Sequence, residues 1–116
     1  FIGEYNGLPF CIMIVKGRKT GNMIKIALLT IPHGDDYILV ASQGGAKTNP
    51  LWYYNLRENP EIEMQVFSDH FKMRAFELSD EEKKEYWPMI VAAYSGYENY
   101  QRVTERNIPV FVCRKI

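Results

Sequence analysis

Short apolar runs bounded by turn-forming residues limit the folds that are open to this chain. Residues 8–16 (LPFCIMIVK), 24–31 (IKIALLTI) and 37–42 (YILVAS) contain β-branched residues and are too short to form stable helices. GRKTG and PHGDD, which follow the first and second runs, are typical of turns. Each run therefore predicts a strand, and residues 8–16 are expected to be buried. The third run is apolar on both faces, and together with the second it predicts two neighbouring central strands.

A β-hairpin is predicted at residues 61–78. EIEMQVF and HFKMRAFEL both alternate apolar and polar side chains, and Ser68 and Asp69 lie between them. VFVCRKI, which follows Pro109, is apolar and β-branched and predicts a last strand. Together, these runs predict about six strands.

Three helices are predicted between and after these strands. The first (PLWYYNLRE) follows Asn49, which can cap an orphan amide, and begins at Pro50, where a missing N–H removes no hydrogen bond. SDEE at residues 79–82 fits a capping box and predicts a second helix with a break or kink near Pro88. A third, short helix is predicted at about residues 96–106.

Short strands with few helices favour a mostly-β fold, in which an antiparallel sheet closes on itself and so leaves few exposed edges. The chain has 116 residues, of which 47% are hydrophobic, and this is enough for one core. We expect a single domain over residues 1–116, with helices flanking the sheet. Because the chain opens on Phe1 rather than methionine, we also expect it to lack an N-terminal segment.

Composition argues against several classes of function. Fourteen basic and fourteen acidic residues cancel, so the chain lacks the cationic excess typical of nucleic-acid-binding proteins. His33 and His70 have no second ligand at helical spacing, so no metal site is expected. Cys11 and Cys113 lie in apolar runs and predict buried free thiols in a cytoplasmic protein. No apolar run is long enough to span a membrane, and no nucleophile motif indicates a hydrolase.

The stretch ASQGGAKTNPLWYYNL at residues 41–56 is the first candidate for a functional site. Gly44 and Gly45 follow a predicted strand and precede a predicted helix, and the pair alone is also compatible with turn geometry. Exposed amides at this pair and at the helix start can bind an anion or a carbonyl oxygen, to which Lys47 adds charge. A flat ligand could then stack on Trp52 or Tyr53.

A basic turn is the second candidate. KGRKTG places Lys16, Arg18 and Lys19 at a predicted hairpin tip, where they would suit a phosphate or carboxylate group. A solvated turn without a ligand is the alternative.

Three tyrosines form the third candidate. Tyr94, Tyr97 and Tyr100 recur at a spacing that places them on one face of a helix. Core packing is one interpretation. Three hydroxyls that need partners if buried favour the other, in which the tyrosines form the wall of a ligand pocket.

Together, GRKTG, ASQGGAKTNPLWYYNL.ENP and DEEKKEYWP…Y..Y..Y…T.R.IPV.VC resemble the deazaflavin-dependent nitroreductase family, a branch of the flavin- and deazaflavin-binding split β-barrel oxidoreductases. The resemblance covers about residues 17–113. It implies a split β-barrel similar to FMN-binding and pyridoxamine-phosphate-oxidase folds. It also implies that the chain binds reduced coenzyme F420 and passes a hydride to an organic acceptor such as a quinone, nitroaromatic or enone.

The resemblance also assigns roles by position. Arg18, Lys19 and Thr20 would hold the phosphate and carboxylate tail of the cofactor. The deazaflavin would be lined by a longer set, consisting of Ser42, Gln43, Gly44, Gly45, Ala46, Lys47, Asn49, Pro50, Leu51 and Trp52. The catalytic candidates are Tyr94, Tyr97, Tyr100 and Ser42, and among them Tyr97 is expected to orient the acceptor or relay a proton. A leucine at Gly45 is predicted to abolish turnover and leave the fold intact.

The chain departs from many relatives at three places. A Pro-Arg pair is replaced by Met23 and Ile24, a basic residue by Gln43, and a tyrosine by Leu29. The lost charges would weaken binding of the anionic tail or move its contacts to Lys25 and Lys47. Each charge-assisted contact is worth roughly 1.5 to 3 kcal/mol. Leu29 bears on the identity of the acceptor.

Other functions are also compatible with the sequence. The same barrel could bind FMN as an oxidoreductase, carry F420 or a quinone without catalysis, or serve only in protein contact. We expect a monomer or weak dimer in the cytoplasm, with peripheral membrane contact through apolar helices as a further possibility.

Overall fold

Strands dominate the computed structural model, which describes residues 4–5 and 7–116. The strands are β1 (Glu4–Tyr5), β2 (Leu8–Lys16), β3 (Met23–Leu29), β4 (Ile31–His33), β5 (Asp36–Val40), β6 (Glu61–Val66), β7 (Asp69–Glu77) and β8 (Val110–Lys115). The helices are α1 (Leu51–Glu58), α2 (Asp80–Ala93), α3 (Gly96–Val103) and a 3-10 turn, η1 (Gln43–Gly45). The predicted order of elements is confirmed, with β1 and β4 as additional short strands.

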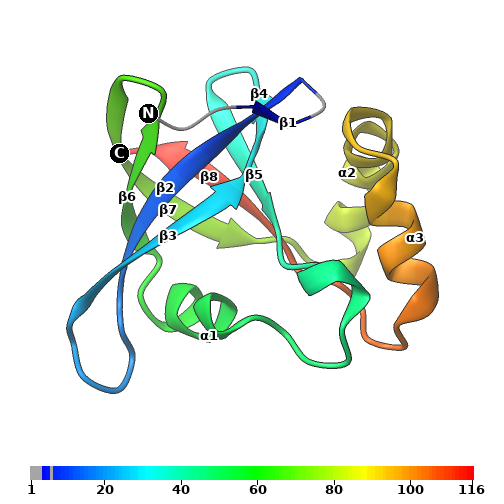
Figure 1. The fold of residues 1–116 in the computed structure, drawn as a ribbon, viewed down its shortest axis with the longest axis horizontal. Helices are drawn as coiled ribbons and strands as arrows, with labels where there is room; N and C mark the ends of the chain where they lie inside the picture. The colour runs from blue at the N-terminus through cyan, green and yellow to red at the C-terminus, as the bar shows by residue number, and fades with distance from the viewer. Residues whose placement is uncertain (1–3, 6) are drawn as a thin grey trace.

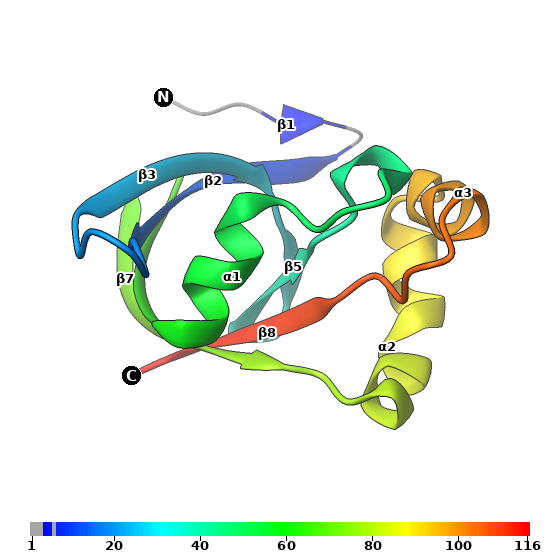
Figure 2. The ribbon, with the colours of Figure 1, turned by 90° about the horizontal axis from the view of Figure 1, so that it is seen from below.

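The strands pair antiparallel in one curled sheet, in the order β1-β2-β6-β7-β8-β5-β4, and β3 pairs with the other side of β2. Figures 1 and 2 show how the sheet curls around an interior, with α1 across one open end. The helices α2 and α3 lie together on the other side of β5 and β8. The predicted mostly-β fold, an antiparallel sheet with flanking helices, is confirmed, and the sheet is curled, with no strand pairing between its β3 and β4 ends among the described residues.

A single residue, Thr30, joins the two ends of this sheet. We predicted one strand over residues 24–31, but the structure has two, because the chain changes partner at Thr30. Its amide donates to the carbonyl of Pro9, which lies in β2, and its hydroxyl donates to the carbonyl of Ile38, which lies in β5. β3 therefore stays on β2, whereas β4 pairs with β5.

Two hydrophobic clusters lie on opposite faces of β5 and β8. The interior cluster joins alternate residues of β2, β6 and β7 to Trp52, Tyr53 and Leu56 of α1. The outer cluster joins Ile38, Val40, Val110 and Val112 to Ile90, Tyr97 and Ile108 from the α2–α3 side. Both strands are thus buried on both faces, as the apolar sequence of β5 predicted.

Several local predictions are confirmed. Ser79 and Glu82 form the predicted capping box at the start of α2. β6 and β7 form the predicted hairpin, with Phe67 at a positive φ of 54° in the turn. Cys11 and Cys113 are free and buried. Among the described residues, no helix is long and apolar enough to cross a membrane.

Three details of the predicted helices are wrong. Asn49 does not cap α1, because its side-chain oxygen accepts a hydrogen bond from Arg106 instead. Of the predicted break or kink near Pro88, the break is wrong, because α2 is one helix from Asp80 to Ala93 with Pro88 inside it. The last helix ends at Val103 rather than near residue 106, because Thr104 and Arg106 bind the loop that follows β5.

Lys83 links α2 to α3 and to the segment that follows it. Its ammonium group lies 2.8 Å from Oε1 of Gln101, 2.5 Å from Oδ1 of Asn107 and 4.7 Å from the centroid of the Trp87 ring. Burial lowers the pKa of Lys83 from 10.5 to about 8, an effect that nearby Asp80 opposes.

This pKa shift predicts a pH-dependent stability. Between pH 8 and pH 10.5 the unfolded chain keeps the Lys83 proton and the folded chain releases it, so the free energy of unfolding should rise with pH in this window. We expect Lys83→Met to remove this rise in urea unfolding curves. Lys84→Met, at an exposed neighbouring position, is the control. The same slope in the Lys83→Met variant would contradict the assignment.

Candidate functional site

A groove opens between β3, the η1 loop and α3. One cavity in it, of about 240 Å³, is lined by Leu28, Leu29, Leu39, Val40, Ser42, Gln43, Pro50, Trp52 and Tyr97. A second, of about 400 Å³, shares Leu29, Ser42 and Tyr97 and adds Phe10, Gly44, Tyr94 and Tyr100. The shared residues make the two cavities neighbouring parts of one groove, which has apolar walls and a polar rim. Figure 1 shows η1 beside α3, with α1 between them and the β2–β3 hairpin.

Arg106 holds the loop that forms one rim of this groove. Its Nε donates to the Ala46 carbonyl at 2.8 Å, and its Nη1 donates to the Ala41 carbonyl at 2.9 Å and to Oδ1 of Asn49 at 2.8 Å. Its Nη2 donates to the carbonyl of Ser42. Burial lowers the pKa of Arg106, but the guanidinium remains charged at neutral pH. The carbonyl oxygens of Ala41, Ser42 and Ala46 are thereby turned toward one half-buried cation.

Thr104 adds a second contact from the same segment, since its hydroxyl donates to the Ala46 carbonyl at 3.3 Å. The segment after α3 therefore binds the loop from Ala41 to Asn49 through both of these side chains. From the sequence, this threonine and arginine stood out only as part of the resemblance, and neither was predicted to have a role. Their only signal was the T.R spacing after the tyrosines.

The two glycines of the loop have different surroundings. Both have positive φ, 63° at Gly44 and 81° at Gly45. A Cβ at Gly44 would meet nothing within 4 Å, and Gly44 lines the groove. A Cβ at Gly45 would lie 2.5 Å from Cγ2 of Val103 and 2.9 Å from the Tyr100 carbonyl. Gly45 is thus required by the packing of the loop on α3, so the prediction that leucine there leaves the fold intact is wrong.

The three predicted tyrosines do meet, although they do not share one helix. Tyr94 ends α2, whereas Tyr97 and Tyr100 belong to α3. Ring centroids lie 4.9 Å apart for Tyr94 and Tyr97 and 6.2 Å apart for Tyr97 and Tyr100, and the hydroxyls of Tyr94 and Tyr100 are 3.3 Å apart. Tyr97 is 5% exposed, and burial together with nearby Tyr100 raises its pKa to about 12. It keeps its proton at neutral pH.

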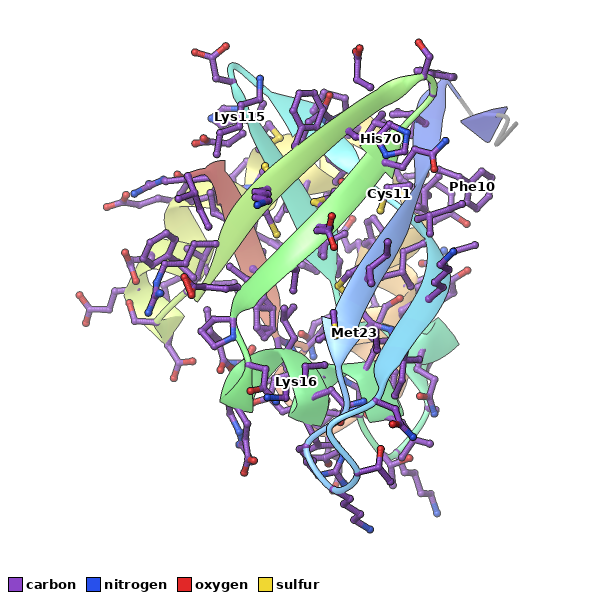
Figure 3. All side chains as sticks on the ribbon, turned by 90° about the vertical axis from the view of Figure 1, so that its left-hand side faces the viewer. Phe10, Cys11, Lys16, Met23, His70 and Lys115 are labelled. Carbon is purple, nitrogen blue, oxygen red and sulfur yellow. The ribbon has the colours of Figure 1, made fainter. Side chains whose placement is uncertain are left out.

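The basic turn lies beside α1, away from the groove. Arg18 donates to Oδ1 of Asn55 from its backbone amide at 3.1 Å and from Nη1 at 3.2 Å, and its Cζ lies 5.2 Å from the centroid of the Tyr54 ring. Lys19 and Thr20 are exposed at the tip. In Figure 3 the hairpin projects beyond Lys16 and Met23, with α1 next to its base.

The other predicted site residues divide between the groove and its surroundings. Ser42, Gln43, Gly44, Pro50 and Trp52 line the groove, as do the three tyrosines. Gly45, Ala46 and Asn49 face α3 or Arg106 instead, Lys47 lines a separate cavity with Arg106, and Leu51 is 75% exposed. Four further lining residues, Phe10, Leu28, Leu39 and Val40, were not predicted, because a strand pattern does not show which residues a later loop leaves uncovered.

The unequal surroundings of the two glycines predict unequal effects of alanine. Both substitutions place a side chain at positive φ, which costs about 1 to 2 kcal/mol. Gly45→Ala should cost clearly more than Gly44→Ala, because the loop must also move away from α3. Urea unfolding of the two variants measures the difference. Equal losses of unfolding free energy would contradict the packing role of Gly45.

Comparison with known proteins adds a family. The profile of the F420H(2)-dependent quinone reductase family matches residues 2–115. A Mycobacterium tuberculosis protein, Rv3178, to which that activity is assigned provisionally, is 37% identical over 107 residues, which are 92% of this chain and 90% of the relative.

Solved structures agree with this match. A structure described as an F420-H2 dependent reductase has a TM-score of 0.83 at 34% identity, over 91% of this chain and 94% of that one. A structure described as a domain-swapped dimer has the same TM-score and identity, over 91% of this chain and 80% of that one.

More distant structures share only the fold. A Clostridium acetobutylicum protein of the pyridoxine-phosphate oxidase family has a TM-score of 0.61 at 13% identity, over 92% of this chain and 75% of that one, which identifies the fold as the split barrel. The family itself is shown by the profile match over residues 2–115 and by the 37% identity to the Mycobacterium tuberculosis protein, so the chain belongs to the F420H(2)-dependent quinone reductase family.

Proposed function

We propose that this protein is an F420-dependent reductase that transfers a hydride from reduced F420 to a flat organic acceptor, with a quinone as the leading class. Membership of the family gives the cofactor and the reaction. The observation that carries the proposal is the groove in which the open rim at Gly44, the hydroxyl-bearing Ser42 and buried Tyr97 meet apolar walls.

The residues present fit the cofactor. A deazaflavin ring is flat and largely apolar, and the groove offers Leu28, Leu29, Val40 and Trp52 together with a glycine that carries no side chain above the rim. The tail of F420 is anionic, and Arg18 presents a charged guanidinium beside α1. Lys19 and Thr20 stand exposed next to it as further donors. The cofactor supplies the hydride chemistry.

The residues of the chain supply binding and orientation. The loop held by Arg106 gives the ring a fixed rim, because four of its polar groups are bound to one guanidinium. Ser42 and Gln43 place polar groups at the edge of the same cavity. Lys47 and Leu51, which lie outside the groove, are given no contact with the ring in this proposal.

Tyr97 is the residue we assign to the acceptor. It lines both parts of the groove, so a molecule in either part would meet it. Its pKa of about 12 means that its hydroxyl stays protonated and can donate a hydrogen bond to an acceptor oxygen. Tyr94 and Tyr100, whose hydroxyls are 3.3 Å apart, support its ring from the side.

The acceptor class follows from the walls around these hydroxyls. Phe10, Leu29 and the tyrosine rings give the outer part of the groove flat apolar surfaces beside polar tips. A quinone combines the same two features, since an apolar ring carries two carbonyl oxygens. Nitroaromatics and enones share this pattern and are further acceptors to test.

For the oligomeric state of the protein, we propose a monomer or a weak dimer.

Binding of F420 tests the proposal directly. We expect titration with oxidised F420 to change the measured fluorescence as the complex forms. F420 should bind at least about tenfold more tightly than FMN, because only the longer anionic tail of F420 would gain a charge-assisted contact at Arg18. Tighter binding of FMN would favour the flavin enzyme instead. Binding of reduced F420 without its oxidation by any quinone, nitroaromatic or enone would favour a carrier.

Removal of one hydroxyl tests the role of Tyr97. Tyr97→Phe should lower kcat by about tenfold or more, the value of one hydrogen bond to a developing charge, and leave the Kd for F420 unchanged. Because burial raises the pKa of Tyr97 to about 12, wild-type activity should show no titration of this hydroxyl near neutral pH. Tyr86→Phe, on α2 and paired with His33 away from the groove, is the matched control. An equal loss of F420 affinity would place Tyr97 against the cofactor instead.

A further inference from the structure

The contact between α1 and the β2–β3 hairpin brings one buried amide against one cation. Asn55 is 7% exposed, and its Oδ1 accepts from both the backbone amide and the guanidinium of Arg18. A single oxygen therefore fixes where the Arg18 backbone lies and where its side chain points. Because residues 18 and 55 are far apart in sequence, this contact defines the position of the hairpin tip relative to α1.

A second contact fixes the plane of the guanidinium. The ring of Tyr54, next to Asn55 in α1, lies 5.2 Å from Cζ of Arg18. The same ring lies 5.6 Å from Cζ of Arg57, so two cations share one aromatic surface. The guanidinium is held by an amide oxygen and an aromatic ring, both of which are neutral.

The charge of Arg18 is left unpaired by this arrangement. Within residues 7–116 the ion pairs are Arg74–Glu61, Arg102–Glu98 and Arg114–Asp36, and none includes Arg18. A neutral acceptor uses one of the five guanidinium N–H groups and does not cancel the charge. An aspartate at position 55 would hold the side chain equally well but would pair with it and compete with any anion.

From these contacts we infer that Asn55 is a positioning residue, which holds Arg18 in a fixed place with its charge free for the anionic tail of the cofactor. The inference rests on the proposed function. Asn55 was not predicted from the sequence to take part in binding. For this role the side chain must be neutral as well as able to accept a hydrogen bond.

The hydrogen bond can be tested without the cofactor. In the wild-type protein, the Arg18 amide should exchange its hydrogen slowly, because Asn55 accepts it. Asn55→Ala should speed this exchange, whereas Asn55→Asp, which keeps an oxygen at the same place, should preserve the protection. Fast exchange of the Arg18 amide in the wild-type protein would overturn the inference.

The role in binding is tested with F420 and with its analogue that lacks the phosphate-bearing tail. Asn55→Ala and Asn55→Asp should each weaken F420 binding about tenfold. The alanine leaves the Arg18 side chain mobile, and the aspartate pairs with its charge. Both variants should bind the tail-free analogue as the wild type does. A variant that weakens both ligands equally would show a merely structural role and overturn the inference.

A matched control lies one helical turn away. Asn59 donates from Nδ2 to the Lys16 carbonyl at 3.2 Å, so it also ties α1 to the hairpin but does not touch Arg18. Asn59→Ala should leave F420 affinity unchanged. If the wild-type protein fails to bind F420, the proposed function fails. If the wild type binds and Asn55→Asp binds equally well, only the inference fails.

Discussion

The four hydrogen bonds from Arg106 to the loop after β5 are the interaction on which the candidate site depends. Three carbonyl groups and the Asn49 side chain converge on this one guanidinium. Carbonyl dipoles rather than a carboxylate stabilise the cation, so its positive charge remains as a local field beneath the loop. A lysine in place of this half-buried arginine would lose hydrogen bonds to the loop, because only a planar guanidinium group reaches several acceptors at once.

The position of the groove follows from the two-sided burial of β5 and β8. The interior cluster is covered by α1 across the barrel end, and the outer cluster is covered by α2 and α3 on the opposite face. The chain that leaves β5 must therefore cross from one covered face toward the other. Ser42 and Gln43 lie at this crossing, with Trp52 of the interior cluster on one side and Tyr97 of the outer cluster on the other. The groove occupies the junction between two cores.

Much of this fold could be predicted from local patterns. The period-two alternation of residues 61–78 and the capping box at Ser79 depend on neighbours within a few residues, and both are confirmed. The break at Thr30 could not be predicted, because the apolar run continues through the residue at which the chain changes its partner strand. Sequence pattern reports burial, and it does not report which strand lies alongside.

The candidate site was predictable only in part, for the same reason. Resemblance selected the loop, the tyrosines and Arg18, but it treated the glycine pair as one unit. The structure separates a glycine that opens onto the groove from one that contacts α3, a distinction that depends on residues more than fifty positions away. Asn55 and Arg106 were missed because their contacts, to residues 18 and 41–49, are long-range.

The loop after β5 and the Arg106 side chain that holds it are made at different times during translation. The loop is complete by residue 49, but Arg106 lies 57 residues further along the chain. During translation from the N-terminus, the loop emerges well before the cation that holds its carbonyl groups. Until residue 106 has been made, the loop therefore lacks the four hydrogen bonds that fix the rim of the groove. A nascent chain that lacks this segment has no assembled site with which to capture a cofactor.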